Sequence, residues 1–114
     1  MPAIVANYIR NPSAGGKFVV LMSRDGGDAG VVVLSDFSLD SQHLDIVRRW
    51  EEGGKITLPA AGLRVAGGGW WKYRADGILE LYGQSGSFGR FNPAWLRSNL
   101  APGMVGCEIG INVR

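Results

Sequence analysis

Clustered glycines divide this chain into short segments. Eighteen of its 114 residues are glycine, and adjacent glycines stand at Gly15–Gly16, Gly26–Gly27, Gly53–Gly54 and Gly67–Gly69. Because glycine loses much conformational freedom when it is ordered inside a helix or strand, such clusters favour turns between short elements over long helices. The clusters follow no fixed period, which excludes an array of sequence repeats.

The length and hydrophobicity of the chain fit one folded domain. With 46% hydrophobic and 19% charged side chains, its 114 residues can form one core over residues 1–114, and intrinsic disorder is excluded. The longest apolar run, Phe18–Met22, is far too short to span a bilayer, and Met1–Arg10 lacks the pattern of a signal peptide. We therefore expect a cytoplasmic protein with no membrane partner.

The chain has one cysteine, Cys107, and one histidine, His43. A single cysteine excludes an internal disulfide, and the two residues together cannot supply the usual ligand set of a structural zinc site. We therefore expect neither a metal nor another cofactor. The net charge is only +2, but residues 64–114 hold six basic and three acidic side chains, a bias that mildly favours anionic ligands.

Hydrophobic periodicity predicts an α+β domain. Apolar and β-branched runs bounded by turn residues indicate strands, and Asp76–Gly77 is typical of a tight hairpin turn. Residues 39–52 follow helical spacing, and Gly53–Gly54 would end that helix. Asn92 before Pro93 predicts a second, short helix to residue 100. The predicted strands are 3–9, 17–23, 31–34, 63–65, 71–74, 78–82 and 104–113, and we expect a single mixed β-sheet of about six strands with two helices.

His43 is the first candidate for chemistry, since histidine alone among the side chains has an ordinary pKa near neutrality. It lies in the first turn of the predicted helix or just before it. Unpaired backbone N–H groups and a partial positive charge at a helix start favour an uncharged imidazole and a nearby anion. The alternative is a capping or packed histidine with no chemical role.

The loop Tyr82–Gly89 is the second candidate. Its small residues allow backbone N–H groups to converge on an anion, and Ser85 and Ser87 add hydroxyl donors. The loop lacks the Lys-Ser/Thr ending of a P-loop. The alternative is an ordinary glycine-rich turn.

Three aromatic residues, Trp70, Trp71 and Tyr73, follow directly on the triple glycine Gly67–Gly69. They either pack alternately into the core or form a stacking surface for bases or sugars. Lys17 opens a predicted strand directly after a glycine pair, a position typical of a solvated edge residue.

Taken together, these segments resemble a known family. In order, the chain shows Lys17–Leu21 on an early strand, His43–Ile46 at a helix start, Gly67–Gly69, Leu81–Ser85 and Phe88–Gly89. In this order and spacing the sequence resembles the Janus, or Ocnus, family, whose characterised animal member is a cofactor-independent phosphohistidine phosphatase. The resemblance extends from about Ala3 to the last predicted strand and implies a phosphohistidine phosphatase-like fold.

The resemblance also implies roles for individual residues. His43 would be the general base that activates the attacking water, and Lys17 would assist at the phosphate. The phosphate would lie against the helix start and the small-residue loop, at His43, Leu44, Ser85, Gly86 and Ser87. The family's phosphatase has an arginine directly after the triple glycine, where this chain has Trp70.

The sequence leads to three functional hypotheses. The first is a hydrolase of phosphoramidates, either phosphohistidine or phospholysine, in a phosphorylated protein or a small molecule. The second is a module of the same fold that binds phosphate, another anion or a phosphoprotein without catalysis. The third is a nucleic-acid or carbohydrate binder that uses Trp70, Trp71 and Tyr73, which the net charge of +2 makes the least favoured.

Overall fold

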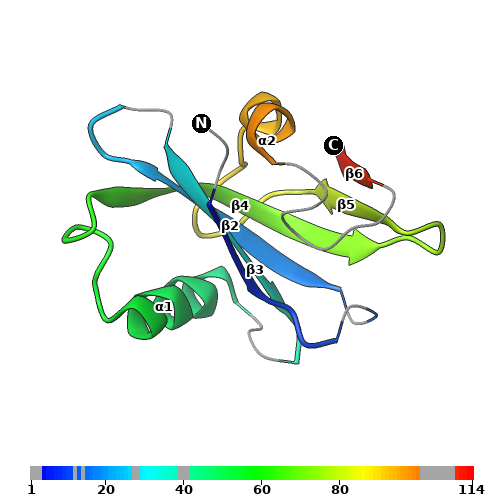
Figure 1. Ribbon diagram of the computed structural model, residues 1–114, viewed down its shortest axis with the longest axis horizontal. Helices are drawn as coiled ribbons and strands as arrows, with labels where there is room; N and C mark the ends of the chain where they lie inside the picture. Colours follow the sequence, from blue (N-terminus) through cyan, green and yellow to red (C-terminus); the bar gives the residue numbers. More distant parts are fainter. Residues whose placement is uncertain (1–3, 12, 14, 27–28, 39–41, 101–109) are drawn as a thin grey trace.

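Six strands and two helices make up the described part of the chain (Figure 1). The computed structural model describes residues 4–11, 13, 15–26, 29–38, 42–100 and 110–114. The elements are β1 (Ile4–Tyr8), β2 (Gly16–Ser23), β3 (Gly30–Asp36), α1 (His43–Gly54), β4 (Leu63–Tyr73), β5 (Ile78–Tyr82), α2 (Pro93–Asn99) and β6 (Gly110–Val113). Neither described helix has the length and hydrophobicity that crossing a membrane requires.

The strands form one mixed sheet in the order β1-β3-β2-β4-β5-β6. Its four central strands pair antiparallel, and the edge strands β1 and β6 each run parallel to their neighbour. Two parallel neighbours need a crossover connection between them. The connection from β1 to β3 contains β2, and the connection from β5 to β6 contains α2. The predicted α+β class, with one mixed sheet and two helices, is confirmed.

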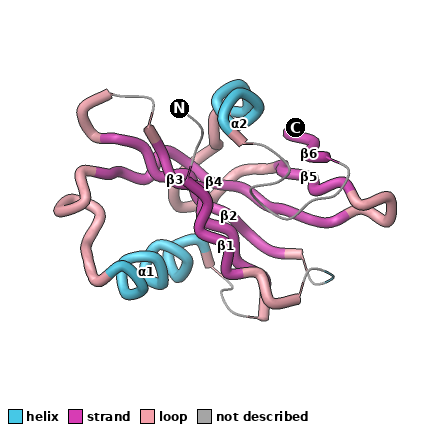
Figure 2. Tube along the Cα trace, in the orientation of Figure 1, coloured by secondary structure: helices cyan, strands magenta, loops and turns pink. Residues whose placement is uncertain are grey.

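Strand β2 is buried on both faces of the sheet. Phe18 and Val20 belong to the apolar cluster that includes Leu96 of α2, whereas Val19 and Leu21 belong to the cluster that includes Ile46 of α1. Figure 2 shows the two helices on opposite sides of the sheet. Since neither face of β2 meets water, its sequence is a continuous apolar run rather than an alternating one.

Helix α1 differs from its prediction at both ends. It begins at His43, and the predicted start at Leu39 lies outside the described residues. Gly53 and Gly54 do not stop the helix but form its last residues; the stop is Lys55, which adopts a left-handed conformation with φ 55°. The Lys55 N–H donates to the carbonyl oxygens of Glu51 and Glu52, and the helix ends two residues beyond the predicted Glu52.

The segments 63–65 and 71–74, predicted as separate strands, lie in the single strand β4, which ends one residue earlier at Tyr73. The triple glycine lies inside this strand, at a register shift opposite Val20 and Leu21. Gly67 has φ 141°, and a Cβ there would lie 2.5 Å from the Arg90 carbonyl oxygen. The glycines therefore serve close backbone approach within a strand and do not end one.

The second helix agrees with its prediction. The Asn92 Oδ1 accepts a hydrogen bond of 3.1 Å from the Trp95 N–H, and Pro93 is the first helical residue. The final strand is described only as β6, Gly110–Val113. The remainder of the predicted strand 104–113, together with Cys107, lies outside the described residues.

Candidate functional site

His43 is the first residue of α1 and is anchored to the sheet through a backbone carbonyl. Its Nε2 lies 2.9 Å from the Gly69 carbonyl oxygen on β4. The imidazole lies over Gly68, where a Cβ would stand 3.0 Å from the His43 Cδ2 and 2.6 Å from the Phe18 carbonyl oxygen. The triple glycine thus leaves the space that the imidazole occupies.

This contact determines which ring nitrogen carries the proton in the uncharged imidazole. Since a carbonyl oxygen can only accept, Nε2 carries the proton and Nδ1 keeps the lone pair. The His43 side chain is buried. Burial lowers the pKa of His43, the hydrogen bond to Gly69 opposes this, and the Lys17 charge lowers the pKa further. At neutral pH the imidazole is therefore uncharged, as a general base requires.

Lys17 lies on the same face of the sheet as His43. In the register, Lys17 on β2 stands opposite Trp70 on β4, and its Nζ lies 4.8 Å from the centre of the Trp70 ring. Trp70 also makes an edge-on ring contact with Phe37, at 5.7 Å between ring centres. The ammonium group is thus placed beside aromatic rings and close enough to His43 to affect its pKa.

The small-residue loop reaches the same point on the sheet. The Ser85 Cβ would lie 3.4 Å from a Cβ at Gly68, the position that also faces the His43 ring. Ser85 is 2% exposed. The structure therefore brings together His43, Lys17 and the loop around Ser85, three segments far apart in the sequence.

Two of the expected loop donors are engaged within the loop itself. The Ser85 N–H donates to the Gly89 carbonyl at 3.1 Å, and the Ser87 N–H donates to the Ser85 Oγ at 3.2 Å. The Ser85 Oγ also accepts from the Phe88 N–H. These bonds close the loop as a turn around Ser85, so the prediction that the Ser85 and Ser87 N–H groups face an anion needs correction.

The backbone donors that remain are at the helix start and at Gly86. The His43 and Leu44 N–H groups belong to the first turn of α1 and have no acceptor inside the helix. Gly86 sits between the two engaged serines, and its N–H makes no hydrogen bond within the described residues. A Cβ at Gly86 would meet nothing within 4 Å, so the space beside it is open.

The three aromatics of the third hypothesis do not form one surface. Trp71 is 1% exposed, and its ring packs edge-on against Tyr73 in the cluster on the side of α2. Its indole N–H donates to the Ser35 carbonyl. Trp70 belongs to the opposite face with Lys17, because side chains alternate along a strand. Of the two interpretations of these aromatics, the structure therefore agrees with alternate packing and not with one stacking surface of all three.

Asp36 is a polar residue near the site that the sequence analysis does not identify. It is fully buried at the end of β3, opposite Gly16, and accepts the N–H groups of Arg10 and Asn11 at 2.5 and 2.7 Å. Burial alone would raise its pKa, but bonds from Ser38, Asn11 and Arg10 outweigh burial and lower the pKa to about 2. In the sequence, the only indication of this role is that an acidic residue stands at the end of an apolar strand.

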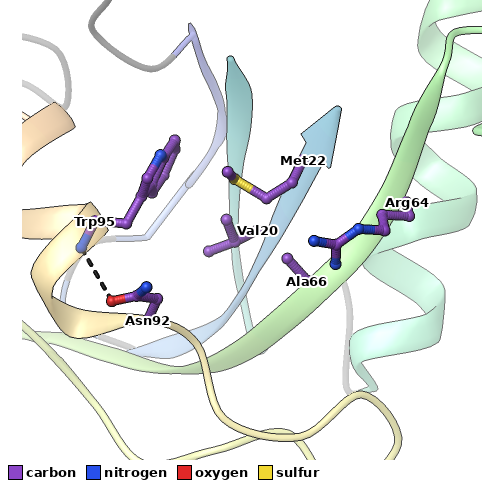
Figure 3. A pocket seen from close by; sticks show the side chains of 6 residues that line it. All are labelled: Val20, Met22, Arg64, Ala66, Asn92 and Trp95. Carbon is purple, nitrogen blue, oxygen red and sulfur yellow. Dashed lines mark hydrogen bonds between the residues drawn. The ribbon is translucent and has the colours of Figure 1, made fainter. Parts of the chain in front are cut away.

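Two hollows lie away from this site. One, of about 230 Å³, is on the α2 side of the sheet (Figure 3) and is lined by Val20, Met22, Arg64, Ala66, Asn92 and Trp95. The other is almost wholly apolar and lies between β1, β3 and the end of α1. Among the described residues, no three His, Cys, Asp or Glu side chains gather as metal ligands.

The chain is similar to the sex-regulated protein janus-A of Drosophila simulans. The two sequences are 35% identical over 88 residues, which cover 75% of this chain. This similarity supports membership in the Janus family. The chain spans 62% of the length of the Janus relative. No family model matches the chain. The name janus-A states no chemical activity, so the reaction has to be inferred from the site.

Proposed function

We propose that this protein hydrolyses phosphoramidates such as phosphohistidine or phospholysine, with His43 as general base. One observation carries the proposal: the hydrogen bond to Gly69 leaves the lone pair of an uncharged imidazole on Nδ1. The Lys17 ammonium is close enough to His43 to lower its pKa, and the backbone N–H groups of His43, Leu44 and Gly86 would donate to a bound phosphoryl group. A phosphoryl group needs such donors, because its transfer is catalysed mainly by positioning and charge stabilisation.

The proposed reaction uses one water molecule. The His43 Nδ1 takes a proton from the water as its oxygen forms a bond to phosphorus. The P–N bond breaks, and the leaving nitrogen keeps the bonding electron pair and takes up a proton, which the imidazolium of His43 supplies. The products are inorganic phosphate and the free amine or imidazole, and His43 returns to its uncharged form.

A turnover assay on phosphohistidine and phospholysine tests this function. We expect hydrolysis by the unaltered chain and a loss of roughly 10²-fold or more in His43→Ala, because general-base catalysis contributes at least that much. Circular dichroism of His43→Ala serves as the folding control. Near-normal turnover in the folded variant would reject His43 as the base.

A non-catalytic anion-binding role is the second candidate, and Trp70 favours it. The indole takes the place at which the resemblance leads us to expect an arginine, and it stacks on Lys17. An NMR titration with inorganic phosphate separates the two candidates. Shifts at Leu44 and Gly86 without turnover of either phosphoramidate would support binding alone.

A further inference from the structure

Part of the sheet face that carries α1 has no described helix over it. Helix α1 packs against β2 and β3, whereas α2 packs on the other side with Leu79 and Leu81 of β5 (Figure 1). Because side chains alternate along a strand, Glu80 and Tyr82 point to the side opposite those leucines. Beside α1, the surface of β4, β5 and β6 is therefore open.

This open surface carries cations around one carboxylate. We call it the basic face and define it by Trp70, Lys72, Arg74, Glu80, Tyr82 and Arg114. Lys72 and Arg114 lie 3.7 and 2.6 Å from the Glu80 Oε2, and their side chains are 51% and 54% exposed, against 9% for Glu80. Arg74 also contacts Glu80 and is paired with Asp76 at 2.9 Å. Lys72 and Arg114 share one buried carboxylate, so positive charge remains accessible to a ligand.

The aromatic rings of the basic face are already covered by cations. The Lys72 Nζ and the Arg114 Cζ each lie 5.4 Å from the centre of the Tyr82 ring, and Lys17 lies over Trp70. A nucleic-acid base would have to displace these cations before it could stack. A carboxylate can approach the exposed side of Lys72 and Arg114 while both cations stay on the Tyr82 ring, which favours an acidic ligand.

The basic face is continuous with the candidate site. Trp70 pairs with Lys17 on one side and with Tyr82 on the other, and β5 pairs with β6. From β2 to β6 the surface crosses three strand spacings, or roughly 14 Å. An extended peptide spans that distance with about four residues.

We propose that the basic face binds an acidic polypeptide segment, and that it does so next to the phosphorylated residue of a protein substrate. The acidic residues would lie within about four positions of the phosphorylated one. That the segment belongs to a substrate rests on the proposed function. Binding of the segment to the basic face is independent of that function, because it can be measured without turnover.

Unphosphorylated peptides test the docking directly. We compare a short Gly/Ser peptide containing several glutamates with matched glutamine and lysine peptides and with an oligothymidylate. The glutamate peptide should shift the amide NMR signals of Lys72, Tyr82 and Arg114, and its affinity should fall with added salt. Equal binding of the glutamine peptide, or tighter binding of the oligothymidylate, would overturn the proposal.

Charge-removing variants locate the contact. Lys72→Gln with Arg114→Gln should weaken binding of the glutamate peptide about three- to tenfold, as expected for two exposed ionic contacts. Arg24→Gln with Arg48→Gln removes the same charge at exposed positions outside the basic face and is the matched control. Equal affinities in the two variants would refute the assignment.

A third variant controls for an effect on folding, because Lys72→Gln with Arg114→Gln leaves the buried Glu80 carboxylate with fewer cationic partners. Adding Glu80→Gln removes this carboxylate charge, which Arg74 alone would otherwise balance, and the affinity should still be lower than in the control. For turnover, acidic flanks should lower KM for a phosphohistidine peptide and leave kcat unchanged. If no phosphoramidate is hydrolysed but the glutamate peptide still binds, the proposed function fails and the docking surface stands.

Discussion

The Nδ1 atom of His43 determines where in the pH range the proposed base is active. Burial and the Lys17 charge lower the pKa of His43, and the hydrogen bond to Gly69 only partly opposes them. The base form therefore persists to a lower pH than for a free histidine, whose pKa is about 6.5. The acidic limb of the pH–rate profile should accordingly lie below that value.

Replacing Lys17 tests this electrostatic link. In Lys17→Gln the phosphoramidate turnover should fall by roughly 10², the usual loss for one stabilising contact. The pKa of His43 should rise, because a neighbouring positive charge is removed. His43 is the only histidine, so its ring resonances report the pKa without assignment. Arg24→Gln is the charge control, and an unchanged His43 pKa in Lys17→Gln would contradict the link.

Gly68 is the glycine on which the site depends most directly. In Gly68→Ala the new methyl group would meet the Phe18 carbonyl oxygen at 2.6 Å and the His43 ring at 3.0 Å. We expect a loss of about 1–3 kcal/mol in unfolding free energy, as for other overpacked positions, with displacement of the imidazole. Urea denaturation and the His43 NMR signals measure both effects. Gly110→Ala, where a Cβ meets nothing within 4 Å, should change neither.

At the scale of strands and loops, Asp36 links the end of β3 by hydrogen bonds to the segment after β1 and to the residues that follow β3. Its two carboxylate oxygens accept from the N–H groups of Arg10, Asn11 and Ser38, and also from the Ser38 hydroxyl. An asparagine can offer only one acceptor oxygen to these donors. Asp36→Asn should therefore lower the unfolding free energy by about 2 kcal/mol at neutral pH. Asp76→Asn, at an exposed turn, is the control.

The effect of Asp36 should depend on pH in a defined direction. The pKa of Asp36 is lowered in the folded state to about 2 from 3.8. Its stabilisation is therefore fully present above about pH 4 and is lost as the pH falls towards 2. Denaturant titrations of the unaltered chain and Asp36→Asn should converge across this window. A difference that stayed constant down to pH 2 would show that the carboxylate charge is not responsible.

For the molecule as a whole, the sequence predicts those features of the fold that depend on residues close together in the chain. The Asn92–Pro93 helix start, the fold class and the apolar strands follow from local patterns, and the structure agrees with them. The continuity of β4 could not be predicted, because glycine propensity argues for a break. The strand contains glycines there because the carbonyl oxygens of Phe18 and Arg90 approach the backbone too closely for a Cβ, and this contact is visible only in the structure.

The same distinction holds for the candidate site. The sequence marks His43, Lys17 and the loop at Ser85, and the structure places them near one another. It could not tell which loop N–H groups are already engaged, because that depends on how the loop closes on Gly89. Nor does it reveal Asp36, whose role depends on donors about 25 positions away in the chain, at Arg10 and Asn11.

The acceptor that holds the imidazole belongs to the main chain of Gly69, and every amino acid carries such a carbonyl. Sequence divergence at the adjacent position 70 can therefore exchange one side chain for another and leave the ring's attachment intact. Whatever side chain stands at position 70, Trp70 in this chain, can therefore alter the surroundings of the imidazole without moving the ring itself.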